Sequence, residues 1–326
     1  MNQLNSQSLK YLCSFHSVSG NTAFVIAELS AMLKKLKIKP VITDYGLLVF
    51  GNLKNPKILI SAHVDEVGFQ VLKKNDDNTF LVGKSGHIDP VMLNNSPVYV
   101  QTKKGKISGT FYPKKELGDN KPEHFSEIIL DTVDNKTIEI GDFGSYQREF
   151  WQKGDKIMAT GLDNKVSVEM ILELIQEFPR MLNSTMFSFV TEEETTYDCI
   201  AGLANLYKPQ YGIVLDMMPV HQVSSTRVDV IPAVGKGPAI LMAMHNYHLH
   251  PLIKEKLVKL KTNYQKIFVD IDFPPEPQNL QRNGVTKGIN ILLPMLGWHN
   301  HVYTMNTKDY LGIKKLIVEL HEILNR

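Results

Sequence analysis

The sequence is poor in cysteine and has no long hydrophobic run. Its two cysteines, Cys13 and Cys199, are too few for a disulfide framework and too isolated for a cysteine-based zinc site. No apolar run approaches the roughly 18–20 residues that a membrane-spanning helix needs. The first residues, Met1 to Leu4, are neither basic nor apolar in the manner of a signal peptide. These absences predict an intracellular protein, which we expect to be cytoplasmic.

Neither sign of charge is in large excess. The 326 residues include 36 Lys and Arg against 34 Asp and Glu, a formal net charge of +2. Nucleic-acid-binding proteins usually carry a basic surplus, so this balance argues against that class. The hydrophobic fraction of 43% can build a real core, which argues against disorder. At about 100–200 residues per domain, the length predicts two domains, or one large domain with an insertion.

Helical and strand patterns alternate in both outer parts of the chain. The first part predicts a helix that contains Val25 and Leu36, short strands at 41–42 and 47–50, and a fully buried strand at 58–60. The pattern resumes after Gly161. The elements predicted there are helices at 166–178, 252–260 and 310–324 and strands at 186–190, 212–215 and 289–293.

Between these parts the sequence contains only short β-rich stretches separated by turn signals. The stretches are 69–72, 80–82, 98–101, 106–111, 128–130 and 137–140. Regular short strands of this kind predict a separate small β domain. Its segment His87-Ile88-Asp89-Pro90 is expected to form a turn or a subunit contact.

The fold class is therefore α/β. We expect a three-layer domain built on a mixed, mainly parallel sheet and interrupted by a small all-β insertion. The expected boundaries are 1–67 and 150–326 for the α/β domain and 68–149 for the insertion.

A histidine and a carboxylate directly follow the buried strand at 58–60. His63 and Asp65 are two residues apart, so their side chains leave the same face of an extended backbone. The carboxylate can then support the imidazole as a metal ligand. Functional groups of α/β folds gather at such strand ends. By itself, however, the pair is more typical of a hydrogen-bonded structural histidine.

Further carboxylates occupy comparable positions. Asp163 directly precedes a predicted helix, which it could simply cap. Glu192, Glu193 and Glu194 follow the strand at 186–190, and three adjacent carboxylates repel one another unless a cation neutralises them. Asp216 follows another predicted strand.

One more histidine, His299 or His301, completes the set, because Trp298-His299-Asn300-His301 follows the last predicted strand. Two histidines with three carboxylates suit a pair of Zn²⁺, Co²⁺ or Mn²⁺ ions bridged by one carboxylate. Each motif has an ordinary structural explanation when it is taken alone. Together they predict a two-metal hydrolase.

These motifs resemble those of the M42 family of metallo-aminopeptidases over nearly the whole chain. The resemblance is carried by residues 61–69, 86–90, 103–109, 141–143 and 161–165. It implies hydrolysis of the N-terminal residue of peptides through a metal-bridging water and a Glu general base. It also implies two divalent ions per subunit, with Zn²⁺ as the first choice and Co²⁺ or Mn²⁺ as alternatives. The insertion resembles the family's PDZ-like dimerisation domain, which implies a dimer-based homo-oligomer, in some members a dodecamer.

For the first metal, the resemblance assigns two ligands of its own and one shared ligand. His63 and Asp216 match the two ligands, and Asp163 matches the residue that bridges both metals. Asp65 matches the carboxylate that supports His63, so it belongs to the catalytic machinery without being a ligand.

For the second metal, Glu194 and His299 match the ligands, and Glu193 matches the general base. Two alternatives stay open. The family's Gln-Glu-Glu motif could begin one residue earlier, so that Glu192 is the base and Glu193 the ligand. His301 lies in the same short loop as His299 and could replace it.

The chain departs from the family pattern at three places. Thr195-Thr196 stand where Val-Gly is usual, the Gly-Thr-Asp-Ala segment is not found, and residues 295–298 replace an Arg-Tyr pair. Two other functions therefore stay open. One is a dimetal amidohydrolase that deacylates small substrates, and the other is an inactive homologue that serves as an assembly or binding subunit.

Overall fold

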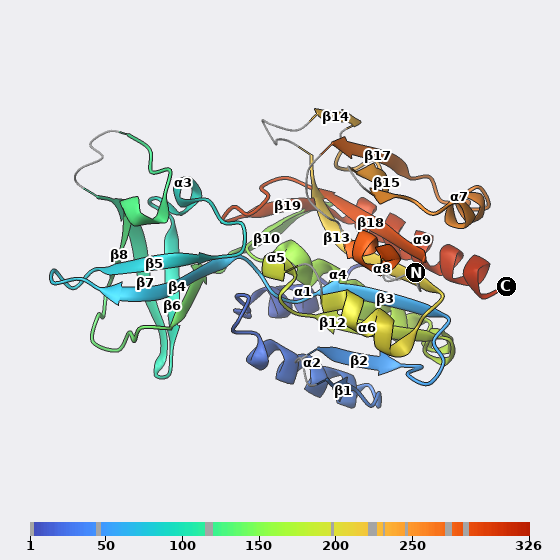
Figure 1. Cartoon of the computed structure of the whole chain (residues 1–326), viewed down its shortest axis with the longest axis horizontal. Helices are drawn as coiled ribbons and strands as arrows, with labels where there is room; N and C mark the ends of the chain where they lie inside the picture. Colours follow the sequence, from blue (N-terminus) through green and yellow to red (C-terminus); the bar gives the residue numbers. More distant parts are fainter. Residues whose placement is uncertain are drawn as a thin grey trace.

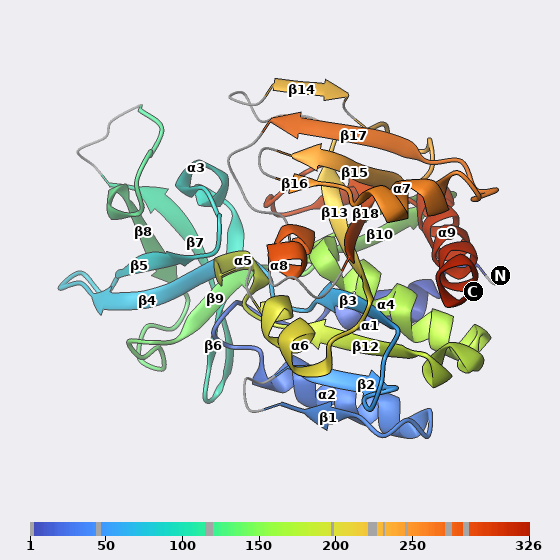
Figure 2. The ribbon, with the colours of Figure 1, turned by 45° about the vertical axis from the view of Figure 1, so that its right-hand side comes forward.

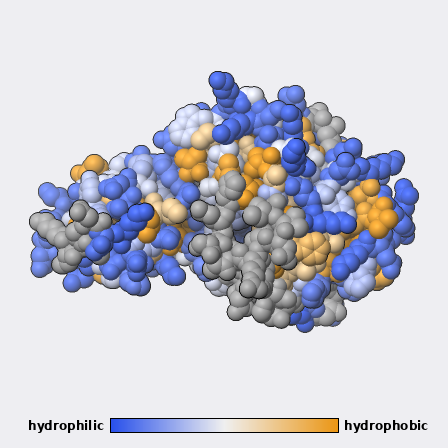
Figure 3. Space-filling view, turned by 90° about the horizontal axis from the view of Figure 1, so that it is seen from above, coloured by the Kyte–Doolittle hydropathy of each residue, from blue (hydrophilic) through white to orange (hydrophobic). Residues whose placement is uncertain are grey.

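The computed structural model describes residues 3–43, 47–114, 120–196, 199–220, 227–230, 232–244, 247–270, 276–282 and 287–326. It has two parts, an α/β domain on the right of Figure 1 and a β barrel on the left. The barrel projects from the larger domain, and its visible surface in Figure 3 is mostly hydrophilic. None of the helices in the described ranges combines the length and the apolar character needed to cross a lipid bilayer.

The α/β domain contains a ten-stranded mixed sheet in the order β1-β2-β12-β3-β13-β18-β15-β17-β14, with β16 paired to β15. The strands are β1 (Val41–Ile42), β2 (Leu48–Gly51), β3 (Ile58–His63), β12 (Thr185–Val190), β13 (Tyr211–Pro219), β14 (Arg227–Val230), β15 (Ala239–Met244), β16 (Tyr247–His248), β17 (Gln265–Asp270) and β18 (Lys287–Met295). The central strands β12, β3, β13 and β18 run parallel. Because β3 and β12 are buried at every position, their sequences are apolar or small except for His63 at the end of β3.

Helices cover both faces of this sheet, which gives the three layers that the sequence predicts (Figure 2). One face packs against α1 (Ser6–Cys13), α2 (Ala23–Lys35), α4 (Leu162–Glu177), α7 (Pro251–Leu257) and α9 (Thr307–Asn325). The other packs against α6 (Cys199–Tyr207) and α8 (Glu276–Arg282). A short helix, α5 (Glu193–Thr196), follows β12, and a 3-10 helix, η3 (Pro179–Asn183), follows α4.

The insertion is a closed barrel of antiparallel strands in the order β4-β5-β8-β7-β6-β9. These are β4 (Gly68–Lys74), β5 (Phe80–Ser85), β6 (Pro97–Thr102), β7 (Gly105–Pro113), β8 (Ile128–Thr132) and β9 (Phe143–Tyr146), with the short helices α3 (Pro90–Leu93) and η2 (Phe125–Glu127). The barrel has a hydrophobic core of its own, which includes Phe69, Phe80 and Phe111. A further sheet has three strands, β10 (Phe150–Lys153), β11 (Lys156–Ala159) and β19 (Tyr303–Asn306).

The predicted mixed sheet and all-β insertion are confirmed, but two predicted elements are wrong in detail. Residues 137–140 form no strand; they lead into a turn at Gly141, which has a φ of +97°. The strand that closes the barrel is instead β9, whose Gly144 lies against the Phe69 ring, where a Cβ would meet a ring carbon at 2.2 Å. Glycine reads as a turn residue in the sequence, which hid this strand.

The other correction concerns the helix predicted at 252–260. Helix α7 ends at Leu257, and the N–H groups of Lys259 and Leu260 turn back to the carbonyls of Lys256 and Leu257. The domain boundaries at 67/68 and 149/150 stay a prediction.

Candidate metal centre

The predicted ligands converge because neighbouring parallel strands end at the same edge of the sheet. His63 is the last residue of β3 and pairs with Val190, the last residue of β12. Glu193 and Glu194 begin α5, and two residues separate this helix from the end of β12. Asp216 lies in β13, which is parallel to β3 on its other side. The carboxyl ends of β12 and β3, and the part of β13 that extends beyond its pairing with β3, thus bring these side chains together, as expected for an α/β fold.

His63 is the centre of the first group of candidate ligands. Its Nε2 lies 3.2 Å from Asp163 Oδ1 and 3.5 Å from Asp216 Oδ1. The ligand atoms of these three residues are close enough to share one ion. Nδ1 of His63 faces the backbone carbonyl of Asp65 at 3.2 Å and its Oδ1 at 3.5 Å. A proton held on Nδ1 leaves the Nε2 lone pair directed at the group.

A second group consists of Asp163, Glu194 and His299. Nε2 of His299 lies 3.3 Å from Glu194 Oε2, and its Nδ1 donates to the backbone carbonyl of His87 at 2.6 Å. Asp163 belongs to both groups, so its carboxylate lies between them. The exposed ring of Trp298 stacks on His299, with the ring centroids 4.1 Å apart.

The insertion also contributes to this second group. Besides the His87 carbonyl, its Gly86 lies against Glu194, because a Cβ on Gly86 would meet the Glu194 carbonyl oxygen at 3.3 Å. Gly86 has a φ of +77°, which a glycine adopts without strain. The expectation of a turn or subunit contact at 87–90 missed this role, since a backbone acceptor leaves no signal in the sequence.

The two alternative candidates, Glu192 and His301, lie outside both of these groups. Nε2 of His301 faces the carbonyl of Gln147 at 2.8 Å, and Oε1 of Glu192 accepts the backbone N–H of Gly20 at 2.7 Å. Neither belongs to a metal-sized group in the described part of the chain. The structure therefore brings together Glu193, Glu194 and His299.

Asp65 connects the two groups. Its Oδ2 accepts the Ser19 hydroxyl at 2.5 Å and the backbone N–H of Glu194 at 3.1 Å, while its other oxygen faces His63. Although burial raises the pKa of Asp65, the hydrogen bonds from His63 and Ser19 outweigh it and lower that pKa. Asp65 thus stays ionised and orients both His63 and the start of α5.

A match to a family sequence model decides the identity of this arrangement. The model of the M42 glutamyl aminopeptidases matches residues 47–316. The chain belongs to the M42 family. It is therefore a metallopeptidase, an enzyme of the hydrolase class.

Known proteins similar to this M42 member include the putative aminopeptidase of Acetivibrio thermocellus, which is 25% identical over 330 residues and covers 95% of this chain and 96% of its own. The TET aminopeptidase from a marine sediment Thaumarchaeota archaeon has a TM-score of 0.87 at 20% identity, over 98% of both chains. The TET1 peptidase of Pyrococcus horikoshii, which can assemble into a tetrahedron or a large octahedral shell, has a TM-score of 0.79 at 22% identity and covers 96% and 98%. These two structures share the fold.

The buried carboxylates of the M42 centre lie so close together that a positive charge between them would stabilise their ionised forms. Burial, reinforced by neighbouring carboxylates, raises the pKa of Glu193 well above its ordinary value. Burial likewise raises the pKa of Glu194 and of Asp216. Although burial lowers the pKa of His63, the nearby carboxylates, Glu193 first, raise it overall. Carboxylates held this close ionise together only when a cation compensates them.

The residues present fit divalent metal ions. Oδ1 of Asp163 is buried and accepts no hydrogen bond. Such orphaned oxygens are rare in folded proteins unless an ion or water satisfies them. Imidazole nitrogens and carboxylate oxygens are also the donors that Zn²⁺, Co²⁺ and Mn²⁺ accept.

One more carboxylate lies beside this centre and was missed by the sequence analysis. Glu276, the first residue of α8, is only 3% exposed, and its Oε2 has no hydrogen-bond partner. Burial, followed by the charges of Asp216 and Asp65, raises its pKa to about 8. Nothing in the local sequence marks Glu276, because only the packing of α8 across β13 and β18 brings it to the site.

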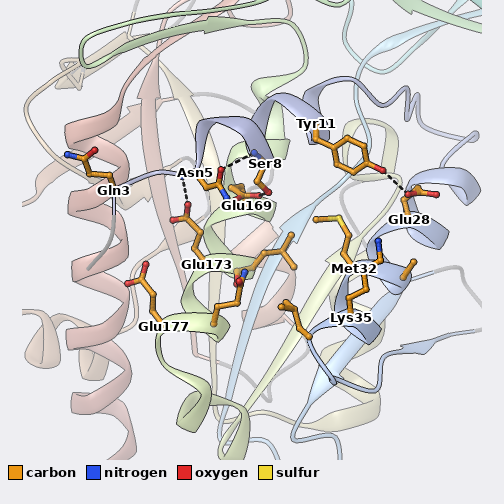
Figure 4. Close-up of a pocket in the computed structure, with 14 residues that line it drawn as sticks. Gln3, Asn5, Ser8, Tyr11, Glu28, Met32, Lys35, Glu169, Glu173 and Glu177 are labelled. Atoms are coloured by element: carbon orange, nitrogen blue, oxygen red, sulfur yellow. Dashed lines mark hydrogen bonds between the residues drawn. The ribbon is translucent and has the colours of Figure 1, made fainter.

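A separate cluster of carboxylates lies away from the metal centre. It borders a cavity of about 610 Å³ between α1, α2 and α4 (Figure 4). Glu169 accepts the Ser8 hydroxyl at 2.6 Å, and Glu173 accepts the Asn5 N–H at 2.7 Å and the Lys314 ammonium at 2.6 Å. Burial raises the pKa of Glu169 to about 7. These bonds tie α1 and α9 to α4, which indicates a structural role.

Proposed function

We propose that the chain is a dimetal-dependent aminopeptidase that hydrolyses the N-terminal residue of peptides. Three candidate metal groups lie among the described residues, and the observation that carries this proposal is that two of them share Asp163. The third consists of His63, Glu193 and Glu194, which places the carboxylate of Glu193 beside both metal positions. A bridging carboxylate between two three-residue groups is the arrangement of a two-metal hydrolase. Membership of the M42 family supports the choice of a peptide as the substrate.

Five residues would hold the two ions. His63 and Asp216 would bind the first, Glu194 and His299 the second, and Asp163 both. When bound, divalent ions at these positions would polarise the scissile carbonyl and make a water molecule acidic enough to attack at neutral pH. Zn²⁺ is the first choice, and Co²⁺ or Mn²⁺ would fit the same donors.

Glu193 is the general base of this proposal. Its Oε2 lies 3.9 Å from His63 Nε2, at the edge of the first group. A carboxylate there can take a proton from the attacking water and return it to the leaving amine. Asp65 would keep His63 in the orientation that binds metal.

Hydrogen bonds outside the metal groups support one choice for each open alternative. Glu192 is occupied by the N–H of Gly20, which favours Glu193 as the base and Glu194 as the ligand. His301 is occupied by the Gln147 carbonyl, which favours His299.

We also propose a homo-oligomer built from dimers through the β insertion. The Pyrococcus horikoshii relative assembles into large shells, and the chain matches that structure over 96% of its length. A dodecamer of this chain is the corresponding expectation. A mass measurement that finds only monomers at working concentration would contradict it.

An aminoacyl-anilide panel tests the activity. The metal-loaded protein should hydrolyse anilides with a free α-amine, lose this activity with a chelator, and leave N-acetylated anilides intact. Hydrolysis of small N-acyl amines alone would instead indicate an amidohydrolase. Two bound ions without turnover of any substrate would indicate an inactive assembly subunit.

A further inference from the structure

Glu276 is a buried carboxylate that the proposed mechanism does not use. Helix α8 packs across β13 and β18, and the Glu276 carboxylate interacts electrostatically with those of Asp216, Asp65 and Glu193, so it lies beside the metal centre. No hydrogen bond satisfies its Oε2, although the residue is almost completely buried. The His63 imidazole is the cation that opposes the negative charge around it. His63 is already committed to a metal group, so Glu276 lacks a cation of its own.

A second orphaned acceptor lies on the same face of the sheet. Asn290 in β18 pairs with Val214 in β13, and its buried Oδ1 has no hydrogen-bond partner. Asp216 is two residues after Val214, so its side chain leaves the same face. Val214 packs in one cluster with Leu280 of α8, so this is the face that α8 covers. Glu276, Asn290 and Asp216 therefore all belong to the space between α8 and the sheet.

The charges leave room for one more cation. The metal centre and its border contain the carboxylates of Asp65, Asp163, Glu193, Glu194, Asp216 and Glu276. Two divalent ions supply four positive charges against these six negative ones. One of the two uncompensated charges belongs to the general base, Glu193, which must be ionised to accept a proton. A monovalent cation that arrives with the substrate can compensate the other.

We infer that Glu276 is the anchor for the α-ammonium group of the substrate's N-terminal residue, with Asn290 Oδ1 as a second acceptor. This inference rests on the proposed aminopeptidase function and adds its recognition element. The side chain of Asp216 is 22% exposed, so the centre opens to solvent beside Glu276. An internal peptide nitrogen carries no charge and leaves Glu276 uncompensated, which restricts cleavage to chain ends.

A pair of ligands that differ by one amine tests this anchor without turnover. Leucine hydroxamate and 4-methylpentanoyl hydroxamate both chelate metal, and only the first carries an α-ammonium. Calorimetry on the metal-loaded wild-type protein should show that leucine hydroxamate binds tighter by roughly ten- to a hundredfold, the worth of a hydrogen-bonded charge pair. Equal affinity of the two ligands for the wild-type protein would overturn the inference.

The variant Glu276→Gln should bind both hydroxamates with the affinity of the weaker one and keep two metal ions per chain. Glu169→Gln is the matched control, because Glu169 is also a buried carboxylate but lies in the cavity of Figure 4. It should retain the full preference for the amine. A Glu276→Gln variant that keeps the wild-type preference would contradict the assignment.

Two further outcomes distinguish this inference from a site for a side-chain ammonium and from the proposed function itself. A preference for 6-aminohexanoyl hydroxamate over both other ligands would overturn the α-ammonium assignment, since that ligand carries only a side-chain-like ammonium. A strong amine preference in a protein that cleaves no anilide would uphold the anchor while the proposed aminopeptidase function fails.

Discussion

His299 donates a hydrogen bond from Nδ1 to the backbone carbonyl of His87, across 2.6 Å of space and 212 positions of sequence. The bond joins a candidate metal ligand of the α/β domain to the loop that follows β5 of the barrel. It fixes which nitrogen of His299 faces Glu194. The insertion is therefore part of the second metal group as well as a separate fold unit.

This relationship predicts that Gly86, the residue before His87, controls metal binding. In Gly86→Ala the new Cβ would press on Val67 at 3.0 Å and on Glu194 at 3.3 Å. We expect the affinity for the second ion to fall by roughly tenfold, the lower end of the effect of disturbing groups that orient a ligand. Titration of the chelated protein with Zn²⁺ measures it.

Gly105 provides the control for backbone strain. It also has a positive φ, +128°, but nothing lies within 4 Å of its added Cβ. Gly105→Ala should lower the stability of the barrel while both ions bind as in the wild type. If both variants weaken metal binding equally, strain in the barrel and not contact with Glu194 is responsible.

The second prediction concerns the base. Glu193→Gln removes the proton acceptor, so kcat should fall by roughly 10²- to 10⁴-fold while two ions remain bound. Glu192→Gln keeps an oxygen for the Gly20 N–H and should retain nearly full activity. Steady-state kinetics with metal analysis checks both. The reverse pattern would place the base at Glu192.

The third prediction concerns the last ligand. His299→Ala should bind about one ion per chain in place of two, because it loses the only imidazole of the second group. His301→Ala loses a bond to the Gln147 carbonyl and a ring contact with Tyr146, and it should keep both ions. Metal analysis after dialysis against a weak chelator distinguishes the two histidines. Loss of an ion from His301→Ala alone would refute the ligand assignment.

The fourth prediction concerns stability and pH. Burial raises the pKa of Glu169 to about 7 in the folded protein, above the unfolded value of about 4.3. The folded state thus binds more protons than the unfolded state between these two values, and this contribution to stability is lost as the pH rises from about 4.5 to 7. Glu169→Gln should therefore gain stability over the wild type between pH 5 and pH 8, by about 2 kcal/mol. Urea unfolding at both pH values measures it, and a constant difference would contradict the prediction.

Those parts of the fold and site that depend on local pattern could be predicted from the sequence. The apolar runs of β3 and β12 end at His63 and just before Glu193, and parallel strands bring such ends together. The alternation of short strands likewise predicted the all-β insertion. In each case, the side chain that matters is adjacent to a strong periodic signal.

Other parts depend on contacts between distant segments. Glu276 reaches the centre because α8 packs across β13 and β18. Pro277 of α8 lies so close to Gly288 of β18 that residue 288 has no room for a side chain. The support that His87 gives to His299 is a backbone carbonyl, which any residue would supply. The strand β9 was hidden because Gly144, required beneath the Phe69 ring, resembles a turn residue.

The central claim is that two ions on groups that share Asp163 drive the hydrolysis of N-terminal residues. Its most direct test is to strip the protein with a chelator and return Zn²⁺ stepwise while following hydrolysis of leucine anilide. The account predicts no activity without metal and a plateau at two ions per chain. Activity that survives complete removal of metal, or that reaches its plateau at one ion per chain, would contradict it.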